Sequence, residues 1–184
     1  DRWQPLATVR ALLAYMWSHP GKQLLFMGQE FAQDAEWSEE RGLDWWLLDH
    51  AEHRGVKDML RDANFVYQET PALWALDHAP QGFEWIDAND QNNNTFSWLR
   101  WDGDGGVVAC VSNFSAVPHF DYRIGLPFAG EWDEVLNTDS QAYGGSGVGN
   151  LGSVTAEDSP WHARPASAAI NVPPLGAVWF RYRG

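Results

Sequence analysis

The sequence predicts an α/β part in residues 1–76, followed by an all-β, antiparallel part in residues 77–184. Three observations support this division. Apolar residues recur at helical spacing in two segments of the first part, and a short continuous apolar run lies between these segments. Beyond about residue 80, short runs of β-type composition alternate with clusters of turn residues. The change in periodicity marks the expected domain boundary.

The α/β part contains two predicted helices and one predicted strand. Residues 5–18 and 49–69 each carry an apolar stripe at helical spacing, and a proline follows each pattern. Residues 22–31 form an apolar run that ends near a glycine, which predicts a strand buried on both faces, as in parallel sheets. A helix, a buried strand and a helix in this order form part of a parallel α/β unit. The functional groups of such a unit lie at the carboxyl end of the strand.

A long loop, residues 28–48, follows the predicted strand. Ordered loops of this length are usually functional, and this one mixes carboxylates with aromatic side chains, a composition that suits a carbohydrate groove. Glu30 follows the strand directly, so we expect it at the mouth of a barrel, in either a structural hydrogen bond or a ligand contact. The paired carboxylates of the loop invite a glycosidase interpretation. For Glu36, Glu39 and Glu40, however, a solvated acidic surface is the favoured interpretation.

Seven runs in the second part are predicted strands, which indicates an antiparallel sandwich or an open barrel. Clusters of Asp, Asn and Gly at residues 87–94 and 102–106 supply turns. The predicted strands are residues 82–86, 95–101, 106–114, 120–125, 131–137, 168–172 and 177–182.

Composition limits the partners of the chain. The formal net charge of −13 argues against nucleic acid and anionic membranes, because the long-range field would repel both. No apolar stretch reaches the roughly 20 residues of a membrane helix. The one cysteine, Cys110, leaves no disulfide framework and favours a reduced, cytoplasmic setting. Because the chain starts with Asp1 and opens almost directly in a helix, we expect it to be a fragment.

Two further patterns have some features of ligand sites. Residues 144–149 are rich in glycine, but they lack the lysine followed by Ser or Thr, and the following helix, of a phosphate-binding loop. We expect a turn between strands there. His50 and His53 have no partner ligand at metal spacing, so solvent-facing or capping histidines are expected and no metal is predicted.

Tryptophan is in large excess, with 12 residues in a chain of 184. For any single tryptophan, core packing is the more common use. Taken together, the twelve still favour a flat ligand with an apolar face, such as a sugar ring. The hydroxyl groups of a sugar would in turn suit the Asp, Glu, Asn and Gln side chains of the chain.

Several longer motifs are spread over the whole chain. They are residues 11–31 (ALLAYMWSHPGKQLLFMGQEF), 36–40 (EWSEE), 43–49 (LDWWLLD), 71–74 (PALW), 82–87 (GFEWID), 135–140 (VLNTDS), 143–146 (YGGS) and 173–176 (PPLG). This string of motifs closely resembles bacterial 1,4-α-glucan (glycogen) branching enzymes, which belong to the α-amylase superfamily.

The resemblance implies an architecture. Residues 1–76 would be the C-terminal end of a (β/α)8 catalytic barrel, with a helix, the eighth strand, its loop and the last helix. Residues 77–184 would be the family's C-terminal β-sandwich. The family's nucleophile, general acid and transition-state-stabilising aspartate lie on earlier barrel strands, so the catalytic residues are expected upstream of this chain. The acidic loop becomes the rim of the substrate groove, and Glu30, Asp44 and Trp45 are the expected substrate-binding residues.

The resemblance also implies a reaction, retaining transglycosylation. A carboxylate nucleophile cleaves an α-1,4 bond, and the 6-hydroxyl of a glucan takes up the covalent glycosyl intermediate in place of water. No cofactor is implied. The expected partners are an α-glucan, such as glycogen or amylose, and the rest of the barrel upstream. The loop containing Trp37, Trp45 and Trp46 could supply one wall of the groove. The chain by itself is expected to be inactive.

Two alternatives remain open at this point. A related α-glucan hydrolase, such as a maltooligosyl-trehalose trehalohydrolase, would use water as the acceptor. The chain could also be a non-catalytic glucan-binding module that uses exposed tryptophans of the β part, such as Trp98 or Trp101. For these two tryptophans, a purely structural role that braces the barrel ranks above binding.

Overall fold

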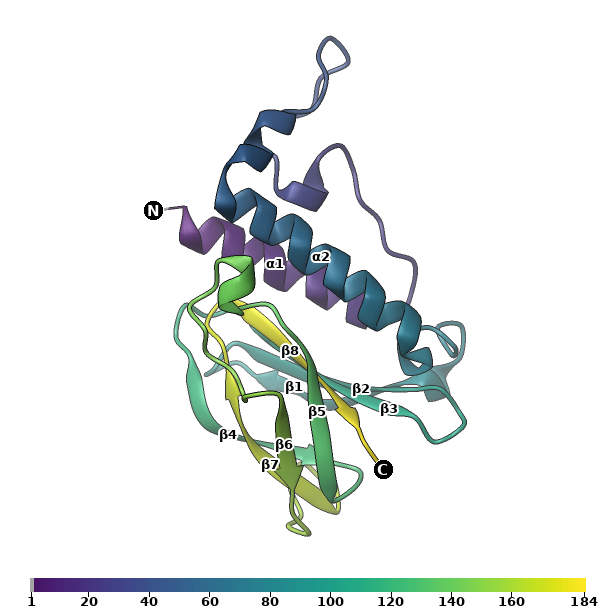
Figure 1. Ribbon diagram of the computed structural model, residues 1–184. Helices are drawn as coiled ribbons and strands as arrows, with labels where there is room; N and C mark the ends of the chain where they lie inside the picture. Colours follow the sequence, from purple (N-terminus) through teal and green to yellow (C-terminus); the bar gives the residue numbers. More distant parts are fainter. Residues whose placement is uncertain (1) are drawn as a thin grey trace.

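The computed structural model describes residues 2–184, which form three layers (Figure 1). Helices α1 (Trp3–Ser18) and α2 (Ala51–Glu69) lie side by side on one face of a six-stranded sheet. A two-stranded sheet covers the opposite face. No helix in residues 2–184 has the length and apolar character needed to cross a lipid bilayer.

All strand pairings in residues 2–184 are antiparallel. The large sheet has the order β1-β2-β3-β8-β5-β6, and β4 pairs with β7 in the small sheet. The strands are β1 (Phe83–Asp90), β2 (Thr95–Trp101), β3 (Val107–Asn113), β4 (His119–Leu126), β5 (Gly130–Asn137), β6 (Ser153–Ala156), β7 (Ala166–Val172) and β8 (Gly176–Tyr182).

The predicted antiparallel sandwich is confirmed, and each of the seven predicted strands corresponds to one of the observed strands. The sequence missed β6. This strand has four residues, lies at the edge of the large sheet and pairs only with β5. Four residues carry too little alternation to stand out from the turn residues around them.

The central strands of the large sheet are covered on both faces. On β3, Val108 and Cys110 pack in the cluster shared with the helices, whereas Val107, Ala109 and Val111 pack in the cluster shared with the small sheet. Successive side chains of a strand point to opposite faces, so both sets are buried. This two-sided burial explains why β3 reads as a continuous apolar run although its neighbours are antiparallel.

The helices and the large sheet share one hydrophobic core. Trp17 of α1 and Met59 of α2 are buried in the same cluster as Trp98 of β2 and Trp179 of β8. The indole Nε1–H of Trp17 donates to Asn64 Oδ1 of α2 at 2.8 Å, which joins the two helices. The domain boundary near residue 76 stays a prediction, and the structure adds that the parts on either side of it pack tightly together.

Residues 22–31 do not form the buried strand that their sequence predicts. The segment is irregular, turns at Gly28 with a left-handed φ of 91°, and ends in the short 3-10 helix η1 (Gln29–Phe31). Leu24 and Phe26 are 74% and 50% exposed. A strand needs neighbouring strands to satisfy its backbone N–H and C=O groups, and none within residues 2–184 pairs with this segment. The predicted parallel α/β unit is therefore not formed in the described part of the chain.

Arg100 of β2 ties three distant segments together. Its side chain is fully buried, and Nη1 donates to the Ser18 carbonyl at the end of α1 at 2.8 Å. Nε donates to the Gly82 carbonyl at 3.2 Å, and Nη2 donates to the Asp77 carboxylate. A buried guanidinium is tolerated only when its donors are paired in this way. The contacts fix the segment before β1 against the end of the first helix.

Candidate functional site

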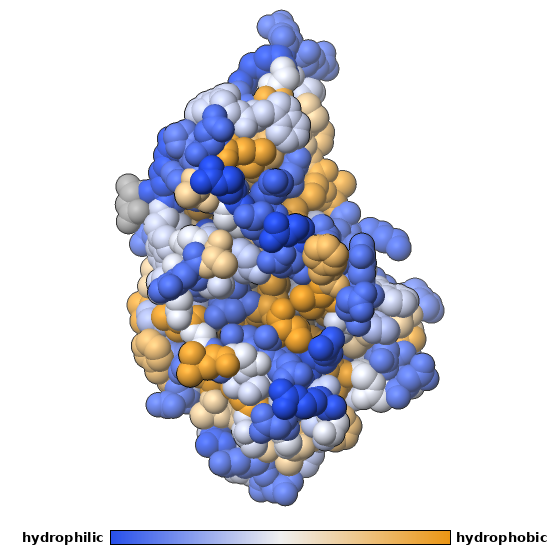
Figure 2. Space-filling model, in the orientation of Figure 1, coloured by the Kyte–Doolittle hydropathy of each residue, from blue (hydrophilic) through white to orange (hydrophobic). Residues whose placement is uncertain are grey.

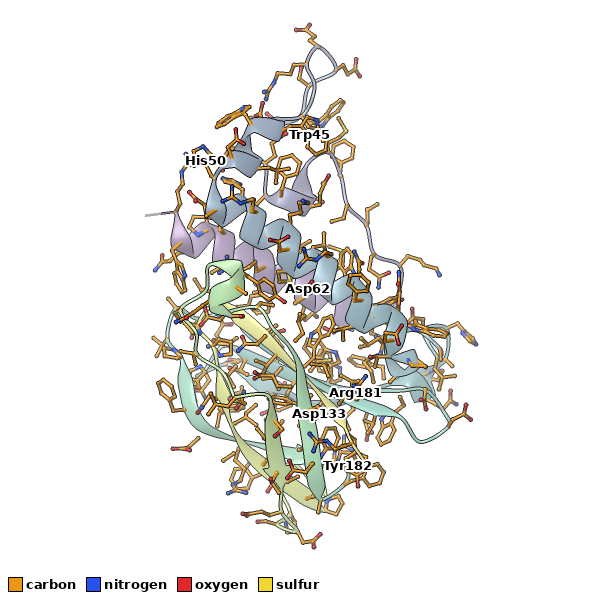
Figure 3. The ribbon with its side chains drawn as sticks, viewed as in Figure 1. Trp45, His50, Asp62, Asp133, Arg181 and Tyr182 are labelled. Atoms are coloured by element: carbon orange, nitrogen blue, oxygen red, sulfur yellow. The ribbon has the colours of Figure 1, made fainter. Side chains whose placement is uncertain are left out.

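The aromatic and acidic loop, residues 28–48, lies at the end of the helical layer farthest from the sheets (Figure 1). Figure 3 labels Trp45 there, well apart from Asp133 and Tyr182 on the strands. Figure 2 shows apolar side chains gathered along the segment beside η1 and over the region where α2 meets β5. Large apolar side chains that are exposed in residues 22–48 are Leu24, Phe26, Met27, Trp37, Trp45 and Trp46.

A small hydrogen-bond network closes this loop. Gln33 Oε1 accepts from the Asp44 backbone N–H at 2.8 Å, and Gln33 Nε2 donates to the Ala35 carbonyl at 3.0 Å. Arg41 donates to Asp44 Oδ1 at 3.0 Å and to the Glu36 carbonyl at 2.9 Å. Asp44 therefore holds the base of the loop. Its side chain is 17% exposed, so the carboxylate is mostly covered by the loop that it holds.

Trp45 begins the 3-10 helix η2 (Trp45–Asp49) and is 57% exposed. Its ring packs on Phe31, with centroids 5.1 Å apart and planes tilted by 38°. Phe31 is itself fully buried, and its carbonyl accepts a hydrogen bond from Nδ1 of the buried His53 at 2.9 Å. The indole is thus supported from beneath while much of its surface faces solvent. This arrangement provides a platform for a flat apolar ligand.

Glu30 lies in η1 and is half-buried. Its carboxylate has no hydrogen-bond or ionic partner in residues 2–184, and it lines a cavity of about 380 Å³ together with Leu25, Lys57 and Leu60. Asp44 and Trp45 do not line this cavity. The structure therefore does not gather the three predicted site residues into one cavity. Glu30 lies in η1, and Asp44 and Trp45 lie at the start of η2; the contact between Phe31 and Trp45 joins the two short helices.

The histidine prediction is partly wrong. His50 is exposed at the start of α2, although its side chain caps no backbone group. His53 is fully buried, because one helical turn carries it to the face of α2 that packs against η1. In the part of the chain that the structure describes, no group of three or more His, Cys, Asp or Glu side chains is placed to hold a metal ion.

The glycine-rich residues 144–149 form a loop between β5 and β6 that surrounds a carboxylate of the chain itself. Asp139 is buried, and its Oδ1 accepts from the Ser146 backbone N–H at 2.8 Å. Its Oδ2 accepts from the Ser146 hydroxyl at 2.5 Å and from the Val148 N–H at 3.1 Å. An internal anion occupies the N–H groups that a phosphate would need. Residues 144–149 therefore serve as a structural loop between two strands, and their geometry gives no support to a nucleotide site.

The suggestion that Trp98 is an exposed platform is wrong. Trp98 is fully buried, and its Nε1–H donates to the Ser18 carbonyl at 3.1 Å. The Tyr15 ring packs edge-on against it, with ring centroids 5.1 Å apart. Trp101 is partly buried against the core between the sheets. The exposed aromatic residues of the β part are others, among them Phe120 (63% exposed) and Trp161 (48% exposed). Neither was predicted as a ligand contact, because the sequence pattern does not show which face of β4 or of the β6–β7 connection is left uncovered.

The β part identifies the class of protein to which the chain belongs. Residues 85–183 match the family model described as "Alpha amylase, C-terminal all-beta domain", and the chain belongs to this family. Similarity to particular proteins extends further along the chain. The 1,4-alpha-glucan branching enzyme GlgB of Leifsonia xyli subsp. xyli is 58% identical over 181 residues, which cover 98% of this chain and 25% of that protein. The enzyme of the same name from Rhodococcus jostii is 61% identical over 183 residues, which cover 97% of this chain and 25% of that protein.

The chain thus spans about a quarter of the length of the curated relatives it matches. Similar folds occur in two solved structures. The Group B Streptococcus pullulanase SAP has a TM-score of 0.63 and 10% identity, over 96% of this chain and 28% of that chain. The catalytic module of the glycogen-degrading pneumococcal virulence factor SpuA has a TM-score of 0.67 and 13% identity, over 97% of this chain and 32% of that chain. The TM-scores, over almost the whole of this chain, show a shared fold that includes the helical layer.

Proposed function

We propose that this chain is the C-terminal part of a 1,4-α-glucan branching enzyme. Such an enzyme cleaves α-1,4 glucan bonds and transfers the released chain to a 6-hydroxyl, forming α-1,6 branches in glycogen. The observation that carries the proposal is the identity of 58% to 61%, over almost the whole chain, with proteins of that name. Because the identity covers the helices and the aromatic loop as well as the β part, it reflects more than a common β domain. A trehalohydrolase is not favoured by these relatives.

We further propose that residues 1–76 complete a (β/α)8 barrel whose other strands lie in the rest of the protein. The apolar segment 22–31 has no strand beside it in residues 2–184 and leaves Leu24, Phe26 and Met27 exposed. Neighbouring parallel strands would satisfy its backbone and cover these side chains. The partners of this part are then the upstream barrel and, across its mouth, an α-glucan.

In this proposal the aromatic loop forms one wall of the substrate groove. Trp45 offers its open face to a glucose ring, since sugar C–H groups stack on aromatic faces. Glu30 offers sugar hydroxyls a carboxylate that has no partner in residues 2–184, and Asp44 holds the loop through Arg41 and Gln33. An ordered wall of this kind favours a glucan acceptor over water. The formal charge of −13 is compatible with a neutral polysaccharide, and the one cysteine is compatible with the cytoplasm.

The chemistry of the reaction falls to residues outside this chain. Retaining glycosyl transfer needs a carboxylate nucleophile and a carboxylic acid about 5 Å apart across the scissile bond. The carboxylates of residues 28–48 lie on a loop, and Asp44 is already paired with Arg41. The residues of this loop position the glucan and do not cleave its bonds.

We expect Trp45→Ala in the full-length protein to raise KM for amylose about fivefold, the ratio that roughly 1 kcal/mol of lost stacking produces. Glu30→Gln should lower kcat/KM as well, because the amide keeps the size of the side chain but loses its charge. Both variants should keep a thermal midpoint within about 2 °C of the unmodified protein, as surface substitutions usually do. Initial rates over a range of amylose concentrations and thermal unfolding scans measure these effects.

Trp74→Ala is the matched control, because Trp74 is 43% exposed and lies outside the aromatic loop. Its KM should stay at the value of the unmodified protein. If Trp45→Ala and Glu30→Gln instead lose several degrees of thermal midpoint while the folded protein keeps normal kinetics, both residues serve packing and the groove proposal fails.

The 184-residue chain by itself should neither branch nor hydrolyse amylose, because in this proposal the nucleophile and the general acid lie on barrel strands outside this chain. Iodine absorbance and new reducing ends measure the two activities, and circular dichroism checks that the chain is folded. A fall in iodine absorbance without new reducing ends, in a folded preparation of the chain alone, would assign the catalytic residues to this chain.

A further inference from the structure

An open groove of about 670 Å³ lies beside β4, on the side of the large sheet that faces away from the helices. Three elements form it. They are the end of β1 and the turn after it, with Asp90 and Asn93; Pro118 and the first half of β4; and the connection between β6 and β7, which we call the strap (residues 157–165). The groove is separate from the aromatic loop, which lies at the far end of the helical layer (Figure 1).

A β-bulge shapes the β4 wall of the groove. The pairing of β4 with β7 shifts register between His119 and Tyr122, and Asp121 adopts a left-handed φ of 52°. In regular pleating, neighbouring residues face opposite sides, whereas here both Phe120 and Asp121 are exposed. Phe120 packs on no other ring in residues 2–184, and the Asp121 carboxylate has no partner there. Bulges commonly redirect side chains in this way beside functional sites.

Trp161 forms the opposite wall on an anchored strap. Its backbone exchanges hydrogen bonds with Arg164 at 3.1 Å and 2.9 Å. The Arg164 guanidinium donates to the Glu84 carboxylate at 2.6 Å and to the Trp85 carbonyl at 3.0 Å, which fastens the strap to β1. The Trp161 side chain is 48% exposed, and its indole N–H has no partner in residues 2–184. A large aromatic face and a free donor are therefore held in place by the fold.

The polar groups of the groove are already ordered. The Asp90 carboxylate accepts from the Tyr122 hydroxyl at 2.7 Å and from the Asn93 amide at 2.8 Å. Burial raises the pKa of Asp90, but these hydrogen bonds outweigh it and keep the pKa below its ordinary value, so the group stays ionised. His119 Nε2 donates to the Asn93 carbonyl at 3.0 Å. The turn after β1 is thereby joined to β4.

The chemistry of these walls selects a neutral, hydroxyl-rich ligand. Two exposed aromatic side chains offer faces to sugar C–H groups, while Asp121 and the Trp161 N–H offer an acceptor and a donor to hydroxyls. Anionic ligands are disfavoured, because the groove holds carboxylates and its cation, Arg123, is engaged with the Ser167 hydroxyl at 2.8 Å. A volume of about 670 Å³ admits several sugar units.

We propose that this groove is a second binding site for an α-glucan chain, distinct from the groove at Trp45. The choice of α-glucan among carbohydrates rests on the proposed function. Phe120 and Trp161 stack on glucose rings, and Asp121 accepts a sugar hydroxyl. The site retains the polysaccharide on the enzyme while the reaction proceeds elsewhere.

The test is native gel electrophoresis of the full-length protein in gels that contain increasing amounts of glycogen. Gel retardation gives the dissociation constant for glycogen. This constant should rise about fivefold for Trp161→Ala and for Phe120→Ala, the loss of affinity typical of removing one aromatic contact. Trp74→Ala, with a comparable exposed tryptophan outside the groove, should leave the retardation unchanged. Branching of short amylose at saturating concentration should be kept by all three variants.

Asp121→Asn provides a variant of nearly the same size, so a folding defect in the aromatic variants does not decide the question. It should raise the dissociation constant about threefold, because the amide oxygen still accepts a hydrogen bond but lacks the charge that strengthens it. Unchanged retardation in Trp161→Ala, Phe120→Ala and Asp121→Asn overturns the second site, as does an equal loss in Trp74→Ala. If the unmodified protein fails to branch amylose but its groove variants still lose retardation, the proposed function fails and the glucan site stands.

Discussion

Replacing Arg100 with alanine is expected to lower the free energy of unfolding by about 3–5 kcal/mol, the usual result of removing one partner of a buried ion pair. The guanidinium is fully buried and donates to the Ser18 and Gly82 carbonyls and to the Asp77 carboxylate. Its removal leaves the mostly buried Asp77 without its cation and the Gly82 carbonyl without this donor. The end of α1 and the segment before β1 lose their common anchor on the sheet.

Denaturant unfolding of the chain, followed by tryptophan fluorescence, measures this loss. Arg181→Ala is the control, because Arg181 is exposed on β8 (Figure 3) and its removal should change stability by no more than about 0.5 kcal/mol. Arg100→Lys should recover only part of the loss, since an ammonium group does not reproduce the planar fork that reaches three acceptors. Full stability in Arg100→Ala would mean that the three segments are held together by apolar packing alone.

Replacing Trp98 with alanine should destabilise the protein by about 3–5 kcal/mol, as for other large-to-small substitutions in cores. The ring is fully buried in the cluster shared by the helices and the large sheet, and Tyr15 packs edge-on against it. The change removes this contact area and also the indole donor to the Ser18 carbonyl. Glucan binding by the protein that remains folded should be unchanged, since no face of Trp98 reaches the surface.

The same denaturant experiment and the glycogen gels measure the two effects separately. Trp161→Ala is the matched comparison. We expect the opposite result for it, namely weaker retention by glycogen and a nearly unchanged free energy of unfolding. If Trp98→Ala loses glycogen retention without losing stability, Trp98 binds glucan, and the conclusion that it serves only core packing is wrong.

Much of the fold was predictable from local patterns. The apolar stripes of residues 5–18 and 49–69 correspond to α1 and α2, and the strand predicted at residues 95–101 has the bounds of β2. These elements depend on short-range periodicity, which a single sequence displays directly. The short edge strand β6 was missed for lack of such a pattern.

The candidate site was predictable only in part. Glu30, Asp44 and Trp45 were selected from one loop. The structure adds that the Glu30 carboxylate has no partner in residues 2–184, that Asp44 is paired with Arg41, and that Trp45 packs on Phe31. Sequence spacing contains no information about such partners, because Phe31 and Trp45 approach each other only after the loop has closed. Whether the three residues bind glucan stays a prediction.

Residue order alone specified the two helices and seven of the eight strands of residues 2–184, though not all of their ends, because hydrogen bonding within a helix and alternation along a strand are local properties. It also carried the family resemblance. The tertiary structure decided which apolar groups are covered. Trp98 is buried because α1 packs on it through Tyr15 and the Ser18 carbonyl, whereas Trp161, on the connection between β6 and β7, stays 48% exposed. Residues 22–31 have the composition of a buried strand and remain irregular, since a strand depends on neighbours that its own residues do not supply.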